Sequence, residues 1–149
     1  MHWSRSGDGY EITTDSSRID VNAVHHFLSV ESYWARDIPR DVVERSIRHS
    51  LSFAILHGEE LAGFARVTSD RATVAYIGDV FVLPAHRGKG LSKWLMECIE
   101  RHPELQGLRR WMLATTDAHG LYARYGFTPL KAAQRWMEKH DPDVYSRKN

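Results

Sequence analysis

A glycine- and cation-rich turn between two apolar segments constrains the fold of this 149-residue chain more than any other feature. The stretch HRGKGLSKWL (86–95) directly follows the apolar run VFVL (80–83). Glycine lets a ligand approach the backbone closely, and the first turn of a helix offers unpaired N–H groups to anions. The sequence therefore predicts a strand, a phosphate-binding turn and a helix in direct succession. The helix should bury one apolar stripe, formed by Leu91, Trp94, Leu95, Cys98 and Ile99.

Strand and helix patterns alternate along the chain and predict a single domain over residues 1–149, of the α/β or α+β class, with a mostly antiparallel sheet. Strand patterns lie at 9–15, at 51–69 as a hairpin, at 71–84 and at 108–116. Helix patterns lie at 19–28, 39–50, 91–102 and 117–126. The segments FTPL (127–130) and QRWMEKH (134–140) predict two short final strands.

Composition and charge argue against several classes of partner. The formal net charge of +1 lacks the basic excess of a nucleic-acid binder, so we expect no nucleic-acid partner. No stretch reaches the roughly 18 apolar residues of a membrane span, so we expect no membrane partner. The nine histidines are scattered and fall in no H-E-x-x-H frame, so we expect no metal. The single Cys98 cannot form an intrachain disulfide, which favours a reducing compartment, and we expect a cytoplasmic protein.

The turn fails the two common nucleotide-binding frames. A P-loop requires G-x-x-x-x-G-K-[ST], but Ala85 stands where its first glycine would precede Gly90. The dinucleotide frame G-x-G-x-x-G finds Gly88 and Gly90, but Lys93 occupies the third glycine position. A nucleotide-binding domain is therefore the least supported interpretation.

A third frame, R-x-x-G-x-G/A after a strand ending in Val, fits residues 82–92. It resembles the coenzyme A motif of the GNAT superfamily of N-acetyltransferases, with Ser92 in place of the usual final Gly or Ala. About thirty residues later, AHGLYARYGF (118–127) is similar to the family pattern A-x-x-[FL]-Y-x-x-x-G-F. Three residues before it, Thr115 stands where the family often has Asn. The resemblance covers roughly residues 50 to 140.

The resemblance implies a GNAT-like fold: a central mixed, mostly antiparallel sheet of about six to seven strands, flanked by about four helices. It implies an enzyme that moves an acetyl group from acetyl-CoA to an amine of a small molecule or peptide, directly in a ternary complex and without a metal. A homodimer is compatible with it. The alternative is a non-catalytic acyl-CoA-binding module or sensor.

The same resemblance assigns roles to named residues. Tyr122 matches the tyrosine that commonly protonates the departing CoA thiolate. Thr115 would lie near the pantetheine arm. Acetyl-CoA would lie along the backbone of Phe81, Val82 and Leu83, with its pyrophosphate on Arg87, Gly88, Lys89, Gly90, Leu91 and Ser92.

The acceptor side is predicted from isolated residues. Asp79 is the one carboxylic acid in VAYIGDVFVL (74–83), where an acid is costly unless solvated or paired. It could bind or deprotonate the amine, or it could occupy an edge or bulge position beside Gly78. His119 is a weaker candidate, three residues before Tyr122. In the loop ESYWARDI (31–38), an apolar wall and an anion clamp could come from Tyr33, Trp34 and Arg36.

Overall fold

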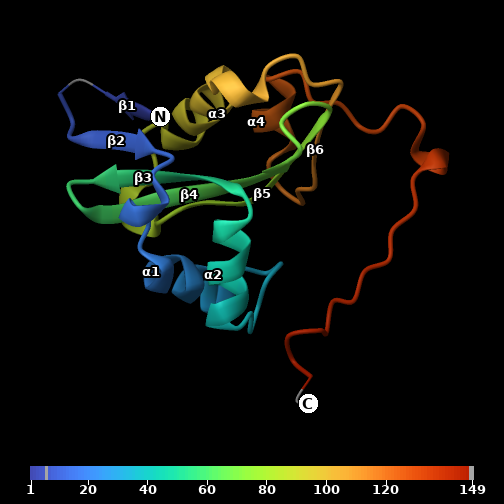
Figure 1. Ribbon diagram of the computed structural model, residues 1–149, viewed down its shortest axis with the longest axis horizontal. Helices are drawn as coiled ribbons and strands as arrows, with labels where there is room; N and C mark the ends of the chain where they lie inside the picture. Colours follow the sequence, from blue (N-terminus) through green and yellow to red (C-terminus); the bar gives the residue numbers. More distant parts are fainter. Residues whose placement is uncertain (6, 148–149) are drawn as a thin grey trace.

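The computed structural model describes residues 1–5 and 7–147, and one mixed sheet organises them (Figure 1). Its strands are β1 (His2–Ser4), β2 (Tyr10–Thr13), β3 (Leu51–His57), β4 (Glu60–Ser69), β5 (Val74–Val82) and β6 (Arg110–Leu113). They lie side by side in chain order, antiparallel except for the parallel pair β5–β6. The expectation of a mixed, mostly antiparallel sheet with about six strands is confirmed.

Helices cover both faces of this sheet (Figure 1). They are α1 (Val21–His26), α2 (Arg40–Arg48), α3 (Leu91–Arg101) and α4 (His119–Ala123). A π-helical turn, Phe27–Glu31, continues α1, and short 3-10 turns occupy Ser16–Arg18, Pro84–His86, Pro103–Leu105 and Ala133–Arg135. One apolar cluster packs α1 and α2 against the sheet, and a second packs α3 and α4 on the opposite face. In the described part of the chain, no helix is both long and apolar enough to cross a bilayer.

Local signals place the two ends of α3 where the sequence predicts them, whereas α4 covers only His119–Ala123 of the predicted 117–126. The Asp20 carboxylate accepts a hydrogen bond from the Ala23 N–H at 3.1 Å and caps α1. Gly90, in the left-handed region at φ +72°, opens α3. The helix ends at Arg101 because the residue before Pro103 disfavours helical geometry.

The sheet opens between β5 and β6. Their parallel pairing runs from Val74 and Arg110 to Ile77 and Leu113, and β5 continues to Val82 paired only with β4. Along its other edge β5 carries a bulge against β4, at Asp79, whose φ of +53° is left-handed. The bulge position expected beside Gly78 is therefore present. The widening gap between the two strands sets the place of the candidate site.

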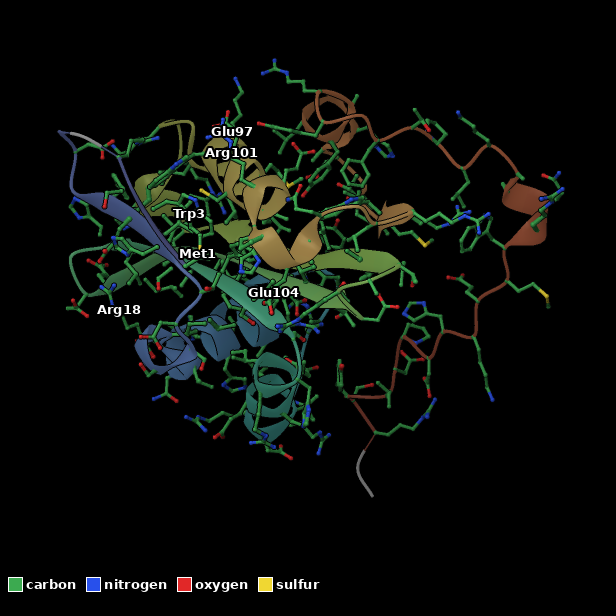
Figure 2. The ribbon with its side chains drawn as sticks, turned by 45° about the horizontal axis from the view of Figure 1, so that its top comes forward. Met1, Trp3, Arg18, Glu97, Arg101 and Glu104 are labelled. Carbon is green, nitrogen blue, oxygen red and sulfur yellow. The ribbon has the colours of Figure 1, made fainter. Side chains whose placement is uncertain are left out.

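Two features of the chain ends differ from the prediction. The strands predicted at 127–130 and 134–140 are wrong, because this segment lies apart from the sheet and carries only a 3-10 turn (Figure 1). Strand β1 was not predicted, since three residues carry too little pattern. Its Trp3 stacks on Phe53 at 6.0 Å between ring centroids and lies beside His102, at the end of α3 (Figure 2).

The buried stripe of α3 supports a first prediction. Leu95 is 0% exposed, and we expect Leu95→Ala to lower the free energy of unfolding by about 2–5 kcal/mol, because it removes transfer energy and leaves a cavity. Urea denaturation measures this value. Glu97→Ala, on the exposed side of the same helix, should change it by less than about 0.5 kcal/mol. Equal effects of both substitutions would contradict the packing described.

Candidate active site

A cavity of about 270 Å³ lies at the N-terminus of α3, at the predicted phosphate-binding turn. Six residues predicted from the sequence line it: Val82, Arg87, Gly88, Gly90, Leu91 and Ser92. Three further lining residues were not predicted: His86, Lys93 and Leu121. Lys89 lies in the same turn and is exposed, outside the lining.

The backbone of the turn has the form of an anion cradle. Gly88 and Gly90 adopt φ values of +79° and +72°, which L side chains rarely adopt. A Cβ added at either position would meet no atom within 4 Å, so the space above both glycines is open. The first helical backbone bond of α3 runs from the Trp94 N–H to the Gly90 carbonyl, so earlier N–H groups are free for an anion. The residues present therefore fit a pyrophosphate.

Two arginines brace this turn. Arg87 Nε donates to the Val82 carbonyl at 2.9 Å and links the turn to the end of β5. Arg5, 84 residues away in sequence from Lys89, donates to the Lys89 carbonyl at 3.0 Å. The Arg5 guanidinium also lies 5.3 Å from the ring centroid of Trp94. Sequence reasoning missed Arg5 because no local pattern connects the N-terminal hairpin to the turn.

The predicted pantetheine residues contribute in different ways. The Phe81 side chain stacks on Phe27 at 4.0 Å and points into the core, so only its backbone can face a ligand. The Leu83 N–H is already used, donating to the Ala62 carbonyl at 2.8 Å. Thr115 accepts a hydrogen bond from the N–H of Ala118 at 3.1 Å and thereby positions the start of α4.

Tyr122 is a buried phenol on α4. It is 7% exposed, and its ring packs edge-to-face against Phe127 at 6.0 Å. Burial raises its pKa, and the charges of Asp117 and Tyr33 raise it further, so the hydroxyl keeps its proton at neutral pH. Tyr125, the other phenol of this segment, donates its hydroxyl to the Lys93 carbonyl at 3.0 Å and joins α4 to α3. The Tyr125 hydroxyl therefore already donates its proton to a backbone hydrogen bond, whereas no such bond from the Tyr122 hydroxyl is found in the described residues.

Asp79 lies at the acceptor side with both carboxylate oxygens hydrogen-bonded. Trp34 Nε1 donates to Oδ1 at 2.9 Å, and Arg66 Nε donates to Oδ2 at 2.8 Å. Arg66 was not predicted from the sequence. It also donates to the hydroxyls of Ser50 and Thr68 at 3.0 and 3.2 Å. A carboxylate offers about four lone-pair positions, so Asp79 can still accept further hydrogen bonds.

The loop 32–37 is held across the opening between β5 and β6. Its Trp34 bonds to Asp79 on β5, and the Tyr33 hydroxyl accepts from Thr116 Oγ1 at 2.8 Å, just beyond β6. Arg36 lies in the same loop and is exposed, and the described residues show no hydrogen bond or ion pair from it to Asp79. His119 is also exposed. The structure thus brings Tyr33 and Trp34 to the opening and leaves Arg36 and His119 free at the surface.

The site offers no activated thiol. Cys98 is buried on α3, and burial raises its pKa to about 12, so it stays a neutral thiol. Within residues 1–5 and 7–147, no group of three or more His, Cys, Asp or Glu side chains is arranged to hold a metal ion. The chemistry available here is proton donation, hydrogen bonding and anion binding.

Comparisons with known proteins agree on one family. The acetyltransferase (GNAT) family profile matches residues 21–127. A provisionally named acetyltransferase of Gibberella zeae is 32% identical over 146 residues, covering 83% of this chain and 80% of its own. The crystal structure of a provisionally assigned GNAT acetyltransferase from Xanthomonas campestris pv. campestris is 54% identical, with a TM-score of 0.91 over 93% of this chain and 97% of that one. A provisionally assigned acetyltransferase of Clostridium acetobutylicum, solved with acetyl-CoA, is 13% identical and shares the fold at a TM-score of 0.59, over 94% and 96% of the chains.

The buried state of Cys98 gives a second prediction. We expect the native protein at pH 8 to react with an aromatic disulfide reagent at least roughly a hundredfold more slowly than the denatured chain, because reaction requires an exposed thiolate. Absorbance of the released thiol measures both rates. The denatured control should yield one thiol per chain. Fast labelling of the native protein would show that the reagent reaches the Cys98 thiol and would contradict its burial.

Proposed function

Because the chain belongs to the GNAT family of acetyltransferases, we propose that it transfers the acetyl group of acetyl-CoA directly to an amine of a small molecule or peptide, within one ternary complex. The observation that carries this proposal is the placement of an open anion cradle and a buried, protonated phenol on α3 and α4, which share one face of the sheet. A binding module needs the cradle alone. The buried Tyr122 favours an enzyme.

The cradle would hold the donor substrate by its pyrophosphate. N–H groups of Gly88 to Ser92 would bind it, since the space beside Gly88 and Gly90 is open, and the partial positive charge of the α3 N-terminus would add to them. Arg87, Lys89 and Lys93 supply cations around it. Acetyl-CoA supplies the acetyl group as a thioester, and the free edge of β5 beyond Ile77 offers backbone groups to its pantetheine arm.

Tyr122 would protonate the sulfur of the departing CoA. A phenol is a weaker acid than an ordinary thiol, so transfer to a solvated thiolate costs free energy. Burial raises the pKa of a thiol as well as that of Tyr122, as Cys98 shows in this same protein. A thiolate formed in a buried site is therefore a stronger base than a solvated one, and Tyr122 would be the phenol that protonates it.

The acceptor amine would lie beside Asp79, between the loop 32–37 and β5. The remaining lone pairs of Asp79 would accept hydrogen bonds from the amine, directly or through water, and Arg66 and Trp34 fix the carboxylate for that role. Tyr33 and Trp34 would form the wall of the acceptor pocket. Arg36 and His119 are the groups within reach of a larger acceptor, and Arg36 suits a carboxylate on it. We place the reaction in the cytoplasm, which suits the single free Cys98.

The decisive experiment measures CoA thiol release from acetyl-CoA against a panel of amines, amino acids and short peptides. Release that depends on both substrates supports the enzyme. A chain that binds acetyl-CoA in calorimetry and releases no thiol with any acceptor would instead be a binding module or sensor.

The cradle gives a prediction on binding alone. Gly90→Asp places a Cβ and a negative charge at the pyrophosphate position, and we expect the acetyl-CoA Kd to rise by at least about tenfold. Isothermal titration calorimetry measures it. Gly107→Asp is the matched control, because Gly107 has the same φ of +72°, equally open surroundings and no place in the cavity. Unchanged affinity in folded Gly90→Asp would refute the phosphate assignment.

Tyr122→Phe separates catalysis from binding. It removes one hydroxyl and little volume, so we expect acetyl-CoA affinity within about twofold and kcat lowered by about 10–10³, the loss typical of a general acid. Tyr125→Phe is the control, and its turnover should stay at the level of the unmodified protein. Because it loses the hydrogen bond from the Tyr125 hydroxyl to the Lys93 carbonyl, its free energy of unfolding should fall by only about 1 kcal/mol. Wild-type turnover in Tyr122→Phe would move the acid to Tyr125 or His119.

A further inference from the structure

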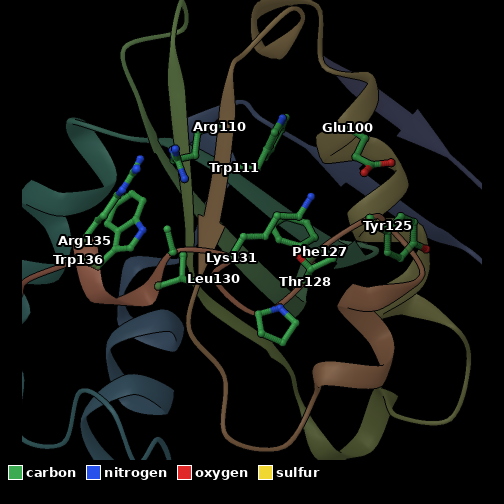
Figure 3. A pocket seen from close by; sticks show the side chains of 13 residues that line it. Glu100, Arg110, Trp111, Tyr125, Phe127, Thr128, Leu130, Lys131, Arg135 and Trp136 are labelled. Atoms are coloured by element: carbon green, nitrogen blue, oxygen red, sulfur yellow. The ribbon is translucent and has the colours of Figure 1, made fainter.

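Two cavities in the described residues differ in the burial of their walls. The larger, about 570 Å³, lies between β6 and residues 126–132, and Arg110, Trp111 and Lys131 are among the side chains around it (Figure 3). Every residue that lines it is exposed or half-buried. The cavity of about 270 Å³ at the glycine turn is lined by the buried His86. A buried polar side chain is costly unless it is hydrogen-bonded, so the partners of His86 determine its role.

The imidazole of His86 is held in place beside the glycine turn. His86 ends the 3-10 turn Pro84–His86, directly before Arg87, and it is 8% exposed. Its Nδ1 lies 2.7 Å from the hydroxyl of Tyr10 on β2, in a buried contact. The Tyr10 ring packs in turn against the His57 ring, at 4.5 Å between the centroids. The strand β2 therefore fixes the orientation of the imidazole.

The Tyr10 hydroxyl determines which nitrogen of the neutral His86 ring carries the proton. A hydroxyl has one proton to donate, and within residues 1–5 and 7–147 the Tyr10 hydroxyl has no hydrogen-bond partner other than His86 Nδ1. A protonated Nδ1 would leave the hydroxyl proton buried without an acceptor, which is unfavourable. The hydroxyl therefore donates to Nδ1, and the ring carries its proton on Nε2.

The Nε2–H group of His86 is a free donor at the cavity. The two nitrogens of an imidazole point away from each other, so Nε2 points away from Tyr10. Nε2 makes no hydrogen bond with any of the described residues. Ser52 Oγ is the one side-chain nitrogen or oxygen in this part of the chain that is both unpaired and sealed from solvent, so Nε2 is not sealed. The open space that the His86 ring borders is the cavity of the glycine turn.

We propose that His86 is a phosphate-binding residue of the donor site: its Nε2–H donates a hydrogen bond to a phosphate oxygen of acetyl-CoA. Tyr10 is the positioning residue that fixes the ring and keeps the proton on Nε2. The inference rests on the proposed function, which supplies the phosphate. The other side-chain donors at the turn include Lys89 and Lys93, which are exposed and flexible. A fixed imidazole loses little side-chain entropy when the phosphate binds, so it adds affinity and direction that those cations do not.

Replacement of His86 by each of the two amides separates the roles of its nitrogens. The Asn amide lies as many bonds from Cβ as Nδ1, and the Gln amide as many as Nε2. His86→Asn keeps a partner for Tyr10 and loses the donor at the Nε2 position, so we expect the acetyl-CoA Kd in calorimetry to rise by at least about tenfold. His86→Gln keeps that donor and should change the Kd by less than about threefold. Equal effects, or the reverse order expected of a merely structural His86, would overturn the proposal.

Tyr10→Phe tests the positioning role with the loss of one hydroxyl. It frees the His86 ring to turn, so we expect the acetyl-CoA Kd to rise by about two- to fivefold. In the His86→Gln background the same substitution should leave the Kd unchanged, because Tyr10 acts through the imidazole. His57→Gln is the control, since His57 packs on the Tyr10 ring without lining the cavity, and its Kd should change by less than about twofold. An equal effect of Tyr10→Phe in both backgrounds would overturn the role of Tyr10.

Nuclear magnetic resonance of the unmodified protein gives a test that needs no variant to fold. Nitrogen-15 chemical shifts of a histidine ring distinguish its two neutral tautomers and respond to hydrogen bonds. We expect the His86 ring, assigned through its contact with Tyr10, to carry its proton on Nε2, and the Nε2 signal to move on saturation with CoA. A proton on Nδ1, or an Nε2 signal that CoA leaves unmoved, would overturn the proposal.

Failure of this inference is distinguishable from failure of the proposed function. An unmodified protein that does not bind acetyl-CoA in calorimetry would overturn both. Acetyl-CoA binding that His86→Asn leaves unchanged would overturn only the assignment of His86, and the acetyltransferase proposal would stand.

Discussion

The parallel pairing of β5 with β6 stops after Ile77 and Leu113, and the position of the whole candidate site depends on that stop. Parallel strands that stay paired present a closed surface. Here β5 runs on to the glycine-rich turn and α3, while the chain after β6 leads to Thr115 and α4. The divergence of the two strands therefore separates the anion cradle from the phenol by the width of an opening. The loop 32–37 bridges that opening from the other face.

The Asp79 bulge shows how the open part of β5 is kept in shape. A non-glycine residue in the left-handed region costs roughly 1–2 kcal/mol. Hydrogen bonds to charged groups each contribute about 1.5–3 kcal/mol net, and Asp79 accepts two, from Arg66 and Trp34. The pair therefore offsets the backbone strain, and it directs the carboxylate toward the acceptor side. Strain held in place by surrounding contacts is common where a backbone position serves a site.

The sequence predicts the parts of this protein that depend on neighbouring residues. The apolar stripe of α3, its glycine turn and the end of the helix before Pro103 follow from local spacing and backbone preference. The groups that were missed act over long distances: Arg5 on Lys89, Arg66 on Asp79 and the buried His86, whose Nδ1 lies 2.7 Å from the Tyr10 hydroxyl. The strands predicted at 127–130 and 134–140 failed for a related reason. A strand pattern describes one partner of a ladder, and the other partner is not encoded in the same segment.

The bond from Arg5 to the Lys89 carbonyl makes the shape of the anion cradle depend on the N-terminal hairpin as well. The turn itself tolerates little change, because its glycines need left-handed backbone. Arg5 lies under no such restriction, although Gly7 and Gly9 of the same hairpin are left-handed, and its guanidinium rests on the Tyr10 and Trp94 rings and on the Asp8 carboxylate. Substitutions in this hairpin can therefore adjust the shape of the anion cradle from a distance. Evolution thus has a means of tuning the cradle that leaves its glycines unaltered.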